Sequence, residues 1–325
     1  MSVGIAGMGF YVPEYRRTNQ MVVSDIREAL KGTNSDWLNK TAEDIVRVSG
    51  IKERRIAAKN EPLSDMAAEA ARRAIKDAGM HPEDIDAMIV ATLTGDCVTP
   101  AAACYVQEKV GLRNLKMIPG DFNGACAGMV GAMRMAKAVI KDEDDPCQNV
   151  LVIGAERISS LIDPHRPESY ILFGDGAAAV ILKEHPRMKL LKFIGGGDGS
   201  KTEVINKTQS GSLSFLGGGI FRFAVQKLPE VTHQLMESVG RNLNDLALVI
   251  PHQANLRIIE AARIKLGFPP VKFFVNLDKY GNTSAPSGFI ALCEAREQER
   301  FKEGDLVAII KFGAGLVWEG CLIEA

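Results

Sequence analysis

The chain has 325 residues, 46% of them hydrophobic, and a net charge of −1 at pH 7. Such a chain can bury a large core, and its balanced charge argues against a nucleic acid or an anionic membrane as partner. No apolar run reaches the roughly 18 residues of a membrane span, and residues 2–17 lack the layout of a signal peptide. The six cysteines include no C-x-x-C pair, so we expect a cytoplasmic protein with reduced thiols and without a zinc site.

Strand and helix patterns alternate along the chain, which predicts an α/β fold. A helix is expected from Ser64, as its N-cap, to Gly79, and another from Ile220 to Gly240 with a bend or break near Pro229. Short apolar runs predict six buried strands, at residues 3–7, 87–92, 149–154, 178–182, 246–250 and 306–312.

The order of these elements repeats within the chain. Residues 68–92 read as a helix, a short turn and a buried strand, and residues 233–250 read the same way. A strand, a Gly-rich turn and a second strand follow at 148–182 and again at 303–323. We therefore expect two similar halves, residues 1–185 and 186–325, with the division in the segment 185–197.

A cysteine surrounded by small residues is the first candidate for chemistry. Cys126, in Asn123-Gly124-Ala125-Cys126-Ala127-Gly128, precedes the apolar stretch Met129–Ile140, in which only Arg134 and Lys137 are charged. A stretch that is apolar on nearly all sides predicts a buried helix. The unpaired amides and the dipole at the start of that helix would favour a thiolate. We therefore predict that Cys126 is a nucleophile.

Two further residues are candidate partners of this cysteine. His252 directly follows a buried strand and Pro251, and ligands of α/β sheets bind at such strand ends. The alternative is a core histidine satisfied by hydrogen bonds. Asn282 lies in Tyr280-Gly281-Asn282-Thr283-Ser284-Ala285, which is also a good sequence for an ordinary turn.

Together these residues resemble a known catalytic set. Cys126 in GACAG, His252 in PHQANLR and Asn282 in YGNTSA resemble the Cys-His-Asn set of β-ketoacyl-acyl carrier protein synthase III, a condensing enzyme of the thiolase superfamily. Segments 50–55 and 173–177 and the final Gly-rich strand also resemble family motifs, in the family's order. The resemblance implies a thiolase-like, five-layered αβαβα fold made of two duplicated halves.

The resemblance also implies a reaction, the decarboxylative Claisen condensation that initiates fatty-acid synthesis. Cys126 would accept the acyl group of a short acyl-CoA primer, and malonyl-acyl carrier protein would lose CO₂ and attack that acyl group. His252 and Asn282 would donate hydrogen bonds to the thioester oxygen, and the backbone amides of Cys126 and Ala314 would form an oxyanion hole. The family further implies a homodimer, and the reaction requires no metal or redox cofactor.

Substrate contacts follow from the same resemblance. Trp37 resembles the tryptophan that stacks on the CoA adenine, with Arg166 as a second face, and Asn255 would line the pantetheine tunnel. The alternatives are a packed aromatic for Trp37 and a solvated loop charge for Arg166. The carrier protein would bind at Gln253, Ala254, Asn255, Leu256 and Arg257, with Arg263 and Lys265 either in the same basic patch or on a solvated helix face.

The chain also departs from the family pattern. The usual phosphate-binding arginine has no clear match; Lys40, Arg47 or neither of them replaces it. Ala314 stands where the family usually has glycine. Thr99 stands where the second subunit usually contributes a bulky apolar side chain to the primer pocket, so that pocket could be widened or redirected.

Three alternatives to this function stay open at the level of sequence. The chain could be a related acyltransferase or condensing enzyme of a secondary, polyketide-type pathway. It could be a Cys-His-Asn thioester hydrolase, since papain-like enzymes use these residue types in this order, although their local sequence around the cysteine is missing. It could also be a non-catalytic partner subunit, but such partners usually lose the nucleophile.

Overall fold

The computed structural model describes residues 2–207, 211, 213–215 and 217–325, and most of its strands belong to one mixed sheet. The strand order is β11-β12-β13-β8-β1-β7-β6-β4-β5. These strands are β1 Val3–Tyr11, β4 Ala87–Ala91, β5 Gly120–Phe122, β6 Asn149–Glu156, β7 Gly176–Glu184, β8 Met188–Gly197, β11 Leu246–Pro251, β12 Leu306–Gly313 and β13 Val317–Glu324. Two short pairs lie outside it, β2 Arg16–Thr18 with β3 Glu53–Arg55 and β9 Ile205–Lys207 with β10 Leu213–Phe215.

The two halves of the sheet contain strands paired in the same directions. β4 and β6 are parallel and β6 and β7 antiparallel, just as β11 and β12 are parallel and β12 and β13 antiparallel. The two series meet where β1 pairs with β8 through only two residue pairs, Gly4 with Lys189 and Ile5 with Met188. This symmetry confirms the internal repeat, while the boundary between residues 185 and 186 stays a prediction.

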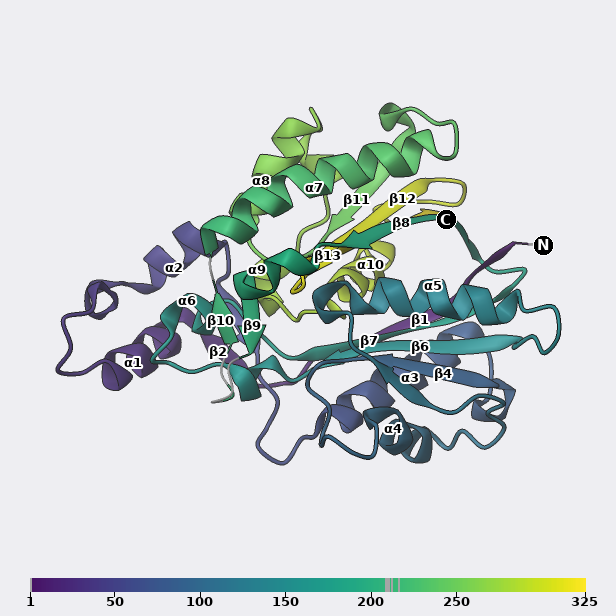
Figure 1. Ribbon diagram of the computed structural model, residues 1–325, viewed down its shortest axis with the longest axis horizontal. Coiled ribbons are helices and arrows are strands. Elements are labelled where there is room, and N and C mark those ends of the chain that lie inside the picture. The colour runs from purple at the N-terminus through teal and green to yellow at the C-terminus, as the bar shows by residue number, and fades with distance from the viewer. Residues whose placement is uncertain (1, 208–210, 212, 216) are drawn as a thin grey trace.

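Helices form the remaining layers, as Figure 1 shows. α3 and α4 cover the outer face of the β1, β4, β6 and β7 series, and α7 and α8 cover the outer face of the other series. α5 and α10 lie between the two series, which confirms the predicted five layers. The helices are α1 Asn19–Ala29, α2 Ala42–Ser49, α3 Leu63–Ala78, α4 Ala102–Val110, α5 Gly128–Ile140, α6 Pro167–Tyr170, α7 Gly217–Glu237, α8 Leu256–Lys265, α9 Leu277–Tyr280 and α10 Ser287–Glu297.

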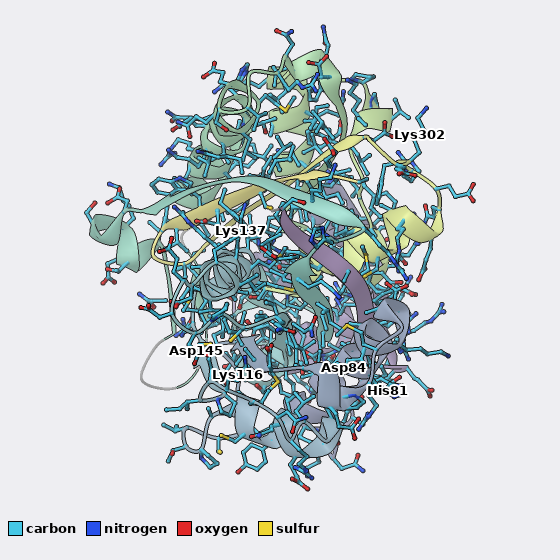
Figure 2. All side chains as sticks on the ribbon, turned by 90° about the vertical axis from the view of Figure 1, so that its right-hand side faces the viewer. His81, Asp84, Lys116, Lys137, Asp145 and Lys302 are labelled. Atoms are coloured by element: carbon cyan, nitrogen blue, oxygen red, sulfur yellow. The ribbon has the colours of Figure 1, made fainter. Side chains whose placement is uncertain are left out.

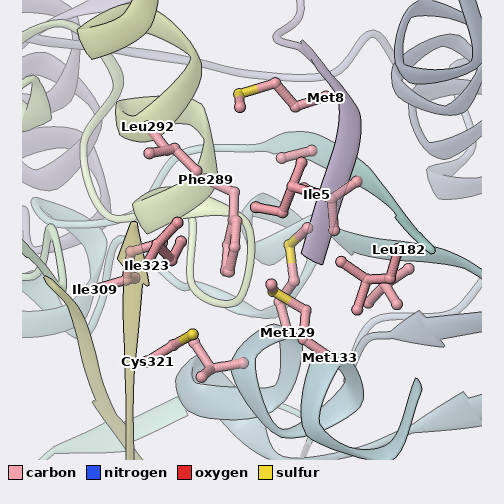
Figure 3. Packing of buried hydrophobic residues seen from close by; sticks show 14 of the residues in the cluster. Ile5, Met8, Met129, Met133, Leu182, Phe289, Leu292, Ile309, Cys321 and Ile323 are labelled. Atoms are coloured by element: carbon pink, nitrogen blue, oxygen red, sulfur yellow. The ribbon is translucent and has the colours of Figure 1, made fainter. Parts of the chain in front are cut away.

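The central layer holds the main core, drawn in Figure 3. Met129 and Met133 of α5 and Phe289 and Leu292 of α10 are fully buried, and they pack in one cluster with strand residues of both series. Those strand residues include Ile5, Leu182, Ile309, Cys321 and Ile323. Such cores are as densely packed as crystals. The packing of α5 against α10 therefore holds the starts of the two helices in fixed positions relative to each other.

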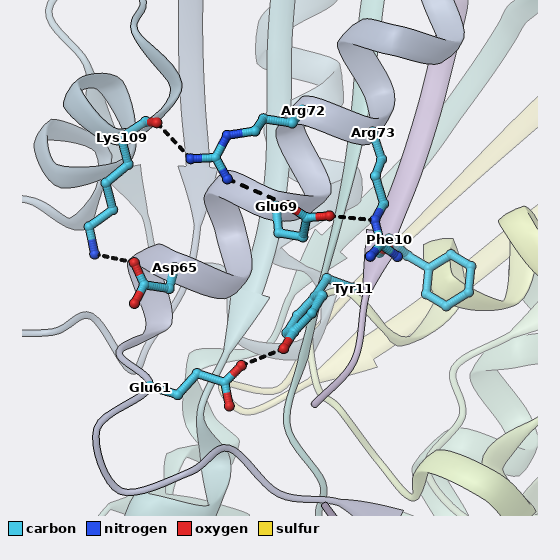
Figure 4. A network of polar contacts seen from close by, with 8 residues as sticks. All are labelled: Phe10, Tyr11, Glu61, Asp65, Glu69, Arg72, Arg73 and Lys109. Atoms are coloured by element: carbon cyan, nitrogen blue, oxygen red, sulfur yellow. Dashed lines mark hydrogen bonds and ion pairs between the residues drawn. The ribbon is translucent and has the colours of Figure 1, made fainter. Parts of the chain in front are cut away.

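The outer helix α3 shows why small residues are needed for this layering. Its alanines face the sheet, and a Cβ added to Gly7 of β1 would lie 2.5 Å from the backbone oxygen of Ala74. The opposite face of α3 is polar: Glu69 bonds Arg72 and Arg73, the latter at 2.9 Å (Figure 4). An alanine-rich face and a glycine-containing strand therefore let helix and sheet approach closely.

The short turns after α3 and α7 are alike in detail, which supports the repeat. In the first, the Asp84 carboxylate accepts a hydrogen bond from the His81 backbone N–H at 2.8 Å; Figure 2 labels both residues. In the second, Asp245 accepts from the Asn242 N–H at 2.9 Å. Both turns are single 3₁₀ turns, η2 Pro82–Asp84 and η6 Leu243–Asp245, and each leads into a buried strand.

The structure adds detail to three sequence predictions about elements. Most of the segment 185–197, where the division between the halves is expected, forms strand β8, and the division itself stays a prediction. The helix with an expected bend or break near Pro229 is not broken there but continues as α7, with Pro229 buried. Ser64 lies inside α3 rather than at its N-cap, and its hydroxyl accepts a hydrogen bond from Lys109 Nζ at 2.8 Å.

Candidate active site

Cys126, His252 and Asn282, which three separate segments contribute, line one small cavity. Its volume is about 60 Å³, and the starts of α5, α8 and α10 lie around it. The remaining wall is mostly apolar, formed by side chains that include Leu93, Ile158, Phe173, Ile205, Leu213, Ile220 and Phe312. The predicted association of the three polar residues is therefore present in the fold, inside a largely apolar site.

Cys126 lies in the 3₁₀ turn η3 Ala125–Ala127, immediately before α5. The preceding Ala125 has a φ of +46°, a conformation that is uncommon outside glycine. The end of β12 passes so close that a Cβ on Gly313 would lie 2.7 Å from the Cys126 backbone nitrogen. Only a glycine allows this approach, which brings the 313–315 loop to the cysteine.

The thiol does not have the lowered pKa that its position before a helix led us to expect. Burial raises the pKa of Cys126, because a thiolate loses its hydration there. The hydrogen bond that the Ser284 hydroxyl donates to Sγ, at 3.3 Å, and the positive charge of Lys311 act in the opposite direction. The cysteine is therefore held mainly as a thiol, next to groups that stabilise negative charge on sulfur.

His252 is buried at the end of β11 and has defined partners. Its Nδ1 lies 3.1 Å from the Ser287 hydroxyl oxygen, at the start of α10, and its ring packs edge-on against Phe312 with centroids 4.9 Å apart. Burial, and secondarily the charge of Lys311, hold the pKa of His252 well below its usual value. The imidazole is therefore neutral at physiological pH and can donate through one nitrogen only.

The carboxamide of Asn282 is oriented by its own loop. Its Oδ1 accepts a hydrogen bond from the Ser284 backbone N–H at 2.9 Å. Its backbone is anchored as well, since the Asn282 N–H donates to the Leu172 oxygen at 2.8 Å. With the oxygen engaged, the amide nitrogen is the group that can donate to a ligand in the cavity.

Sequence reasoning missed a second set of polar residues behind the cysteine. Glu156 and Lys311 are both fully buried, and Ser284 Oγ lies 3.3 Å from Glu156 Oε1 as well as 3.3 Å from the cysteine sulfur. Burial raises the pKa of Glu156 to about 8 despite hydrogen bonds from neighbouring groups such as the Thr94 hydroxyl. The sequence signal that could have revealed them is that each is the only charged residue of an otherwise apolar strand, Glu156 in β6 and Lys311 in β12.

Glu156 should make stability depend on pH in a defined direction. The pKa of Glu156 is about 8 in the folded protein, whereas an ordinary glutamate, as in the unfolded chain, has a pKa of 4.5. Between pH 4.5 and pH 8 the folded state therefore keeps a proton that the unfolded state has lost. The wild type should therefore lose stability relative to Glu156→Gln as pH rises from 4.5 to 8, by on the order of 1 kcal/mol for each pH unit. Urea denaturation at pH 5.5, 6.5 and 7.5 measures the difference.

The exposed Glu83→Gln is the matched control for that series, and it should show no such trend. A constant difference between wild type and Glu156→Gln across these pH values would contradict the assignment of a protonated Glu156.

A second cavity, of about 330 Å³, adjoins the first. Neighbouring residues of the chain line different cavities. Ala254 and Phe173 line the first cavity, and the adjacent Asn255 and Leu172 line the second. Trp37 lines the second cavity, and its indole N–H donates to Glu168 at 3.2 Å. The wall also contains Lys40 and Arg47, both candidates for phosphate binding, but not Arg166, which is exposed at the start of α6.

Comparisons with known proteins agree with this geometry. Two family descriptions match, 3-oxoacyl-[acyl-carrier-protein] synthase III over residues 120–199 and the C-terminal part of the same enzyme over residues 236–325. A β-ketoacyl-[acyl-carrier-protein] synthase III of Fusobacterium nucleatum is 39% identical to the chain, over 99% of the chain and 98% of the relative. The chain belongs to the β-ketoacyl-acyl carrier protein synthase III family. It is thus an acyltransferase-type condensing enzyme.

Other members and solved structures give the same result. A synthase III of Staphylococcus haemolyticus is 37% identical over the whole chain and 99% of its own length. The crystal structure of 3-oxoacyl-[acyl-carrier-protein] synthase III from Aquifex aeolicus superposes with a TM-score of 0.91 at 36% identity, covering 99% of this chain and 100% of that one. A priming β-ketosynthase from the R1128 polyketide pathway has a TM-score of 0.87 at 30% identity, covering 99% and 96%. The thiolase-like fold is therefore confirmed.

The structure corrects part of the expected carrier-protein site of this synthase III. Gln253 and Ala254 are buried, and the Gln253 amide is used internally, donating to the Pro251 oxygen at 2.8 Å. Arg263 is paired with Glu260 at 2.7 Å and is mostly covered. Gln253 and Ala254 turn inward between the strand end and the helix, Asn255 and Leu256 are half-buried, and Arg257 and Lys265 are exposed.

The two positions where the synthase departs from its family lie in different places. Ala314 lines the cavity beside Cys126 and Gly313, as its predicted oxyanion role requires. Thr99 is exposed, next to the exposed Val98, and is not part of the cavity wall within the single chain.

Proposed function

We propose that this synthase III joins a short acyl-CoA primer to malonyl-acyl carrier protein, the condensation that initiates fatty-acid synthesis, with Cys126, His252 and Asn282 as its catalytic residues. The observation that supports this most is the single cavity lined by these three side chains, in a chain 39% identical over nearly its full length to a synthase III. The chemistry is that of thioesters throughout and needs no metal or redox cofactor.

The first step transfers the acyl group to the cysteine. The Cys126 sulfur attacks the thioester carbon, the bond to the CoA sulfur breaks, and the proton of the thiol leaves with CoA as its new thiol. The backbone amides of Cys126 and Ala314 would bind the oxyanion; both residues line the cavity, and Gly313 passes close to the Cys126 amide. The hydrogen bond from Ser284 stabilises the sulfur as it becomes anionic.

The second step forms the new carbon–carbon bond. The malonyl thioester loses CO₂, and the electrons of the broken bond form an enolate with its charge on the thioester oxygen. His252 and Asn282 donate one hydrogen bond each to that oxygen, which a neutral imidazole does without giving up its proton. The enolate carbon then attacks the acyl-cysteine, and the Cys126 thiolate leaves.

The second cavity is suited to the CoA part of the primer. Trp37 can stack on the adenine, Asn255 lies where the two cavities adjoin, and Lys40 or Arg47 can contact phosphate. The innermost cavity is small, about 60 Å³, and mostly apolar, which suits a short acyl group. Arg257 and Lys265, exposed on α8, are the basic residues that an acidic carrier protein would meet there.

A homodimer in the cytoplasm completes the proposal. β5 is one of the two edge strands of the sheet, and near it Val98 and Ile118 are almost fully exposed, with Met117 and Tyr105 partly so. Apolar side chains beside an edge strand are suited to a second copy of the chain, which would also bring Thr99 toward the partner's primer pocket. All six cysteines are free in the structure. Among the described residues, no helix is long and apolar enough to cross a membrane.

Acyl transfer and condensation together test the proposal. Intact-protein mass spectrometry after mixing with acetyl-, isobutyryl- and octanoyl-CoA should show one acyl group added with the short chains and little with octanoyl. Malonyl-acyl carrier protein should then discharge the adduct, with release of CO₂ and formation of 3-oxoacyl-carrier protein.

Other outcomes of these assays would indicate one of the alternative functions. Release of free acid and CoA without consumption of the malonyl thioester would indicate the thioester hydrolase, and absence of both reactions would indicate the non-catalytic subunit. Condensation only with a carrier protein of a polyketide pathway would indicate the secondary-pathway enzyme. This is the second candidate function, because the priming β-ketosynthase of the R1128 polyketide pathway is 30% identical to the chain.

A further inference from the structure

A buried lysine stands directly behind the catalytic histidine. Lys311 lies on β12, one residue before Phe312, and its side chain is fully buried. Its Nζ donates hydrogen bonds to the backbone oxygen of Ser284, at 2.8 Å, and to the hydroxyl oxygen of Ser287. A buried lysine is costly to keep, and the proposed reaction steps give this one no role.

The hydroxyl of Ser287 links this lysine to His252. Its oxygen is bonded on one side to Lys311 Nζ and on the other lies 3.1 Å from His252 Nδ1. An ammonium group donates only, so the Ser287 oxygen must accept from Lys311. The hydroxyl proton is then left for Nδ1, the other described partner of this oxygen, and Nδ1 must be the nitrogen without a proton.

We propose that Lys311 is a positioning residue that, through Ser287, holds His252 in the tautomer protonated on Nε2. This inference uses the proposed function only in assigning the Nε2–H as the donor to the thioester oxygen. The ring lines the cavity while its Nδ1 side is held by Ser287, so Nε2 is the nitrogen available to substrate. The opposite tautomer would present a lone pair to the developing negative charge and would repel it.

The charge of Lys311 acts in the same sense as its hydrogen bond. It contributes, after burial, to the lowered pKa of His252 and so opposes the doubly protonated imidazolium. Burial lowers the pKa of Lys311 itself to about 7, while the nearby Cys126 and Glu156 act to raise it. With a pKa of about 7, Lys311 is mainly in the ammonium form below pH 7, and in that form it can only donate.

Two variants separate the hydrogen bond from the charge. Ser287→Ala removes the link but keeps the ammonium group, whose bond to the Ser284 oxygen persists. Lys311→Met removes both and places an apolar side chain of similar length in the same buried space. The control is Lys137→Met, because Lys137 is a partly buried lysine on α5 that donates to the Leu190 oxygen at 2.8 Å instead (Figure 2 labels it).

The tautomer is read directly from the ring. Long-range ¹H–¹⁵N correlation spectra of ¹⁵N-histidine-labelled protein report which nitrogen carries the proton, and the signals of His252 are those missing in His252→Gln. The wild type and Lys137→Met should show the neutral Nε2–H tautomer at pH 6, where Lys311 is mainly an ammonium group and His252 is still neutral. Ser287→Ala and Lys311→Met should show the Nδ1–H tautomer, alone or mixed with Nε2–H.

Kinetics provides the second readout. Ser287→Ala should lower the rate of malonyl-thioester decarboxylation by about tenfold or more, while acylation of Cys126 changes less than about twofold, and its thermal unfolding should show that it is folded. An Nδ1–H tautomer in the wild type, or an unchanged tautomer in both variants, would overturn the inference. An Nε2–H tautomer in a wild type that forms no acyl-enzyme would instead refute the proposed function and leave this inference standing.

Discussion

Replacing Cys126 by Ala should abolish transfer of an acyl group from CoA to the protein, with a loss of roughly 10⁴-fold or more, because no other thiol lines the described part of the cavity. Intact-protein mass spectrometry should show the unmodified mass after incubation with every acyl-CoA that modifies the wild type. The variant should fold normally, since it loses one sulfur and the weak hydrogen bond from Ser284.

The same variant separates the two steps of the reaction. Decarboxylation of the malonyl thioester requires His252 and Asn282 but no sulfur, so CO₂ release should persist in Cys126→Ala without any condensation product. A Cys126→Ala protein that still becomes acylated would show that the nucleophile has been assigned to the wrong residue.

His252→Ala and Asn282→Ala should have the reverse effect. Each removes one hydrogen-bond donor to the enolate oxygen, and the loss of such a donor typically lowers the rate of the affected step by about 10²–10³-fold. Decarboxylation and condensation should fall by this amount, while acylation of Cys126, which uses the backbone amides, should continue. Stopped assays of CO₂ release and mass spectrometry of the acyl-enzyme measure the two steps separately.

The double variant adds a check on the mechanism. If both side chains donate to the same oxygen, His252→Ala combined with Asn282→Ala should lose less than the product of the two single losses, because groups that act as a unit are not additive. Loss of acylation with retained decarboxylation in either single variant would contradict the roles proposed for them. Lys137→Met, outside the site, again serves as the control.

Much of the fold could be predicted because its strands are buried on both faces. The apolar runs expected at residues 149–154, 178–182 and 306–312 are the cores of β6 Asn149–Glu156, β7 Gly176–Glu184 and β12 Leu306–Gly313. Such runs carry a strong signal. β8 was missed for the opposite reason: its side chains alternate between buried and exposed, and three consecutive glycines end it, which reads as a loop.

The sequence predicted which three residues form the site, but not the buried charged residues around them or the pKa of the thiol. Cys126, His252 and Asn282 each stand in a recognisable motif, whereas a single charge in an apolar strand is the only local sign of Glu156 and Lys311, and it does not show that they lie behind the other three. The thiol pKa was predicted wrongly for the same reason, since burial outweighs the helix start. Gln253 was misplaced because a motif does not show which of its side chains turn inward.

The positions at which the helices begin have a consequence for the chemistry. α5, α8 and α10 all start beside the cavity: Cys126 precedes α5, Ala254 precedes α8 and Ser284 precedes α10. Each helix start carries a partial positive charge from its aligned peptide groups, so three helix starts of the same polarity lie around one cavity. Negative charge is therefore attracted to this point whatever side chains surround it, and the duplication that placed α5 and α10 face to face supplied an electrostatic background on which different acyl-transfer chemistries could be built.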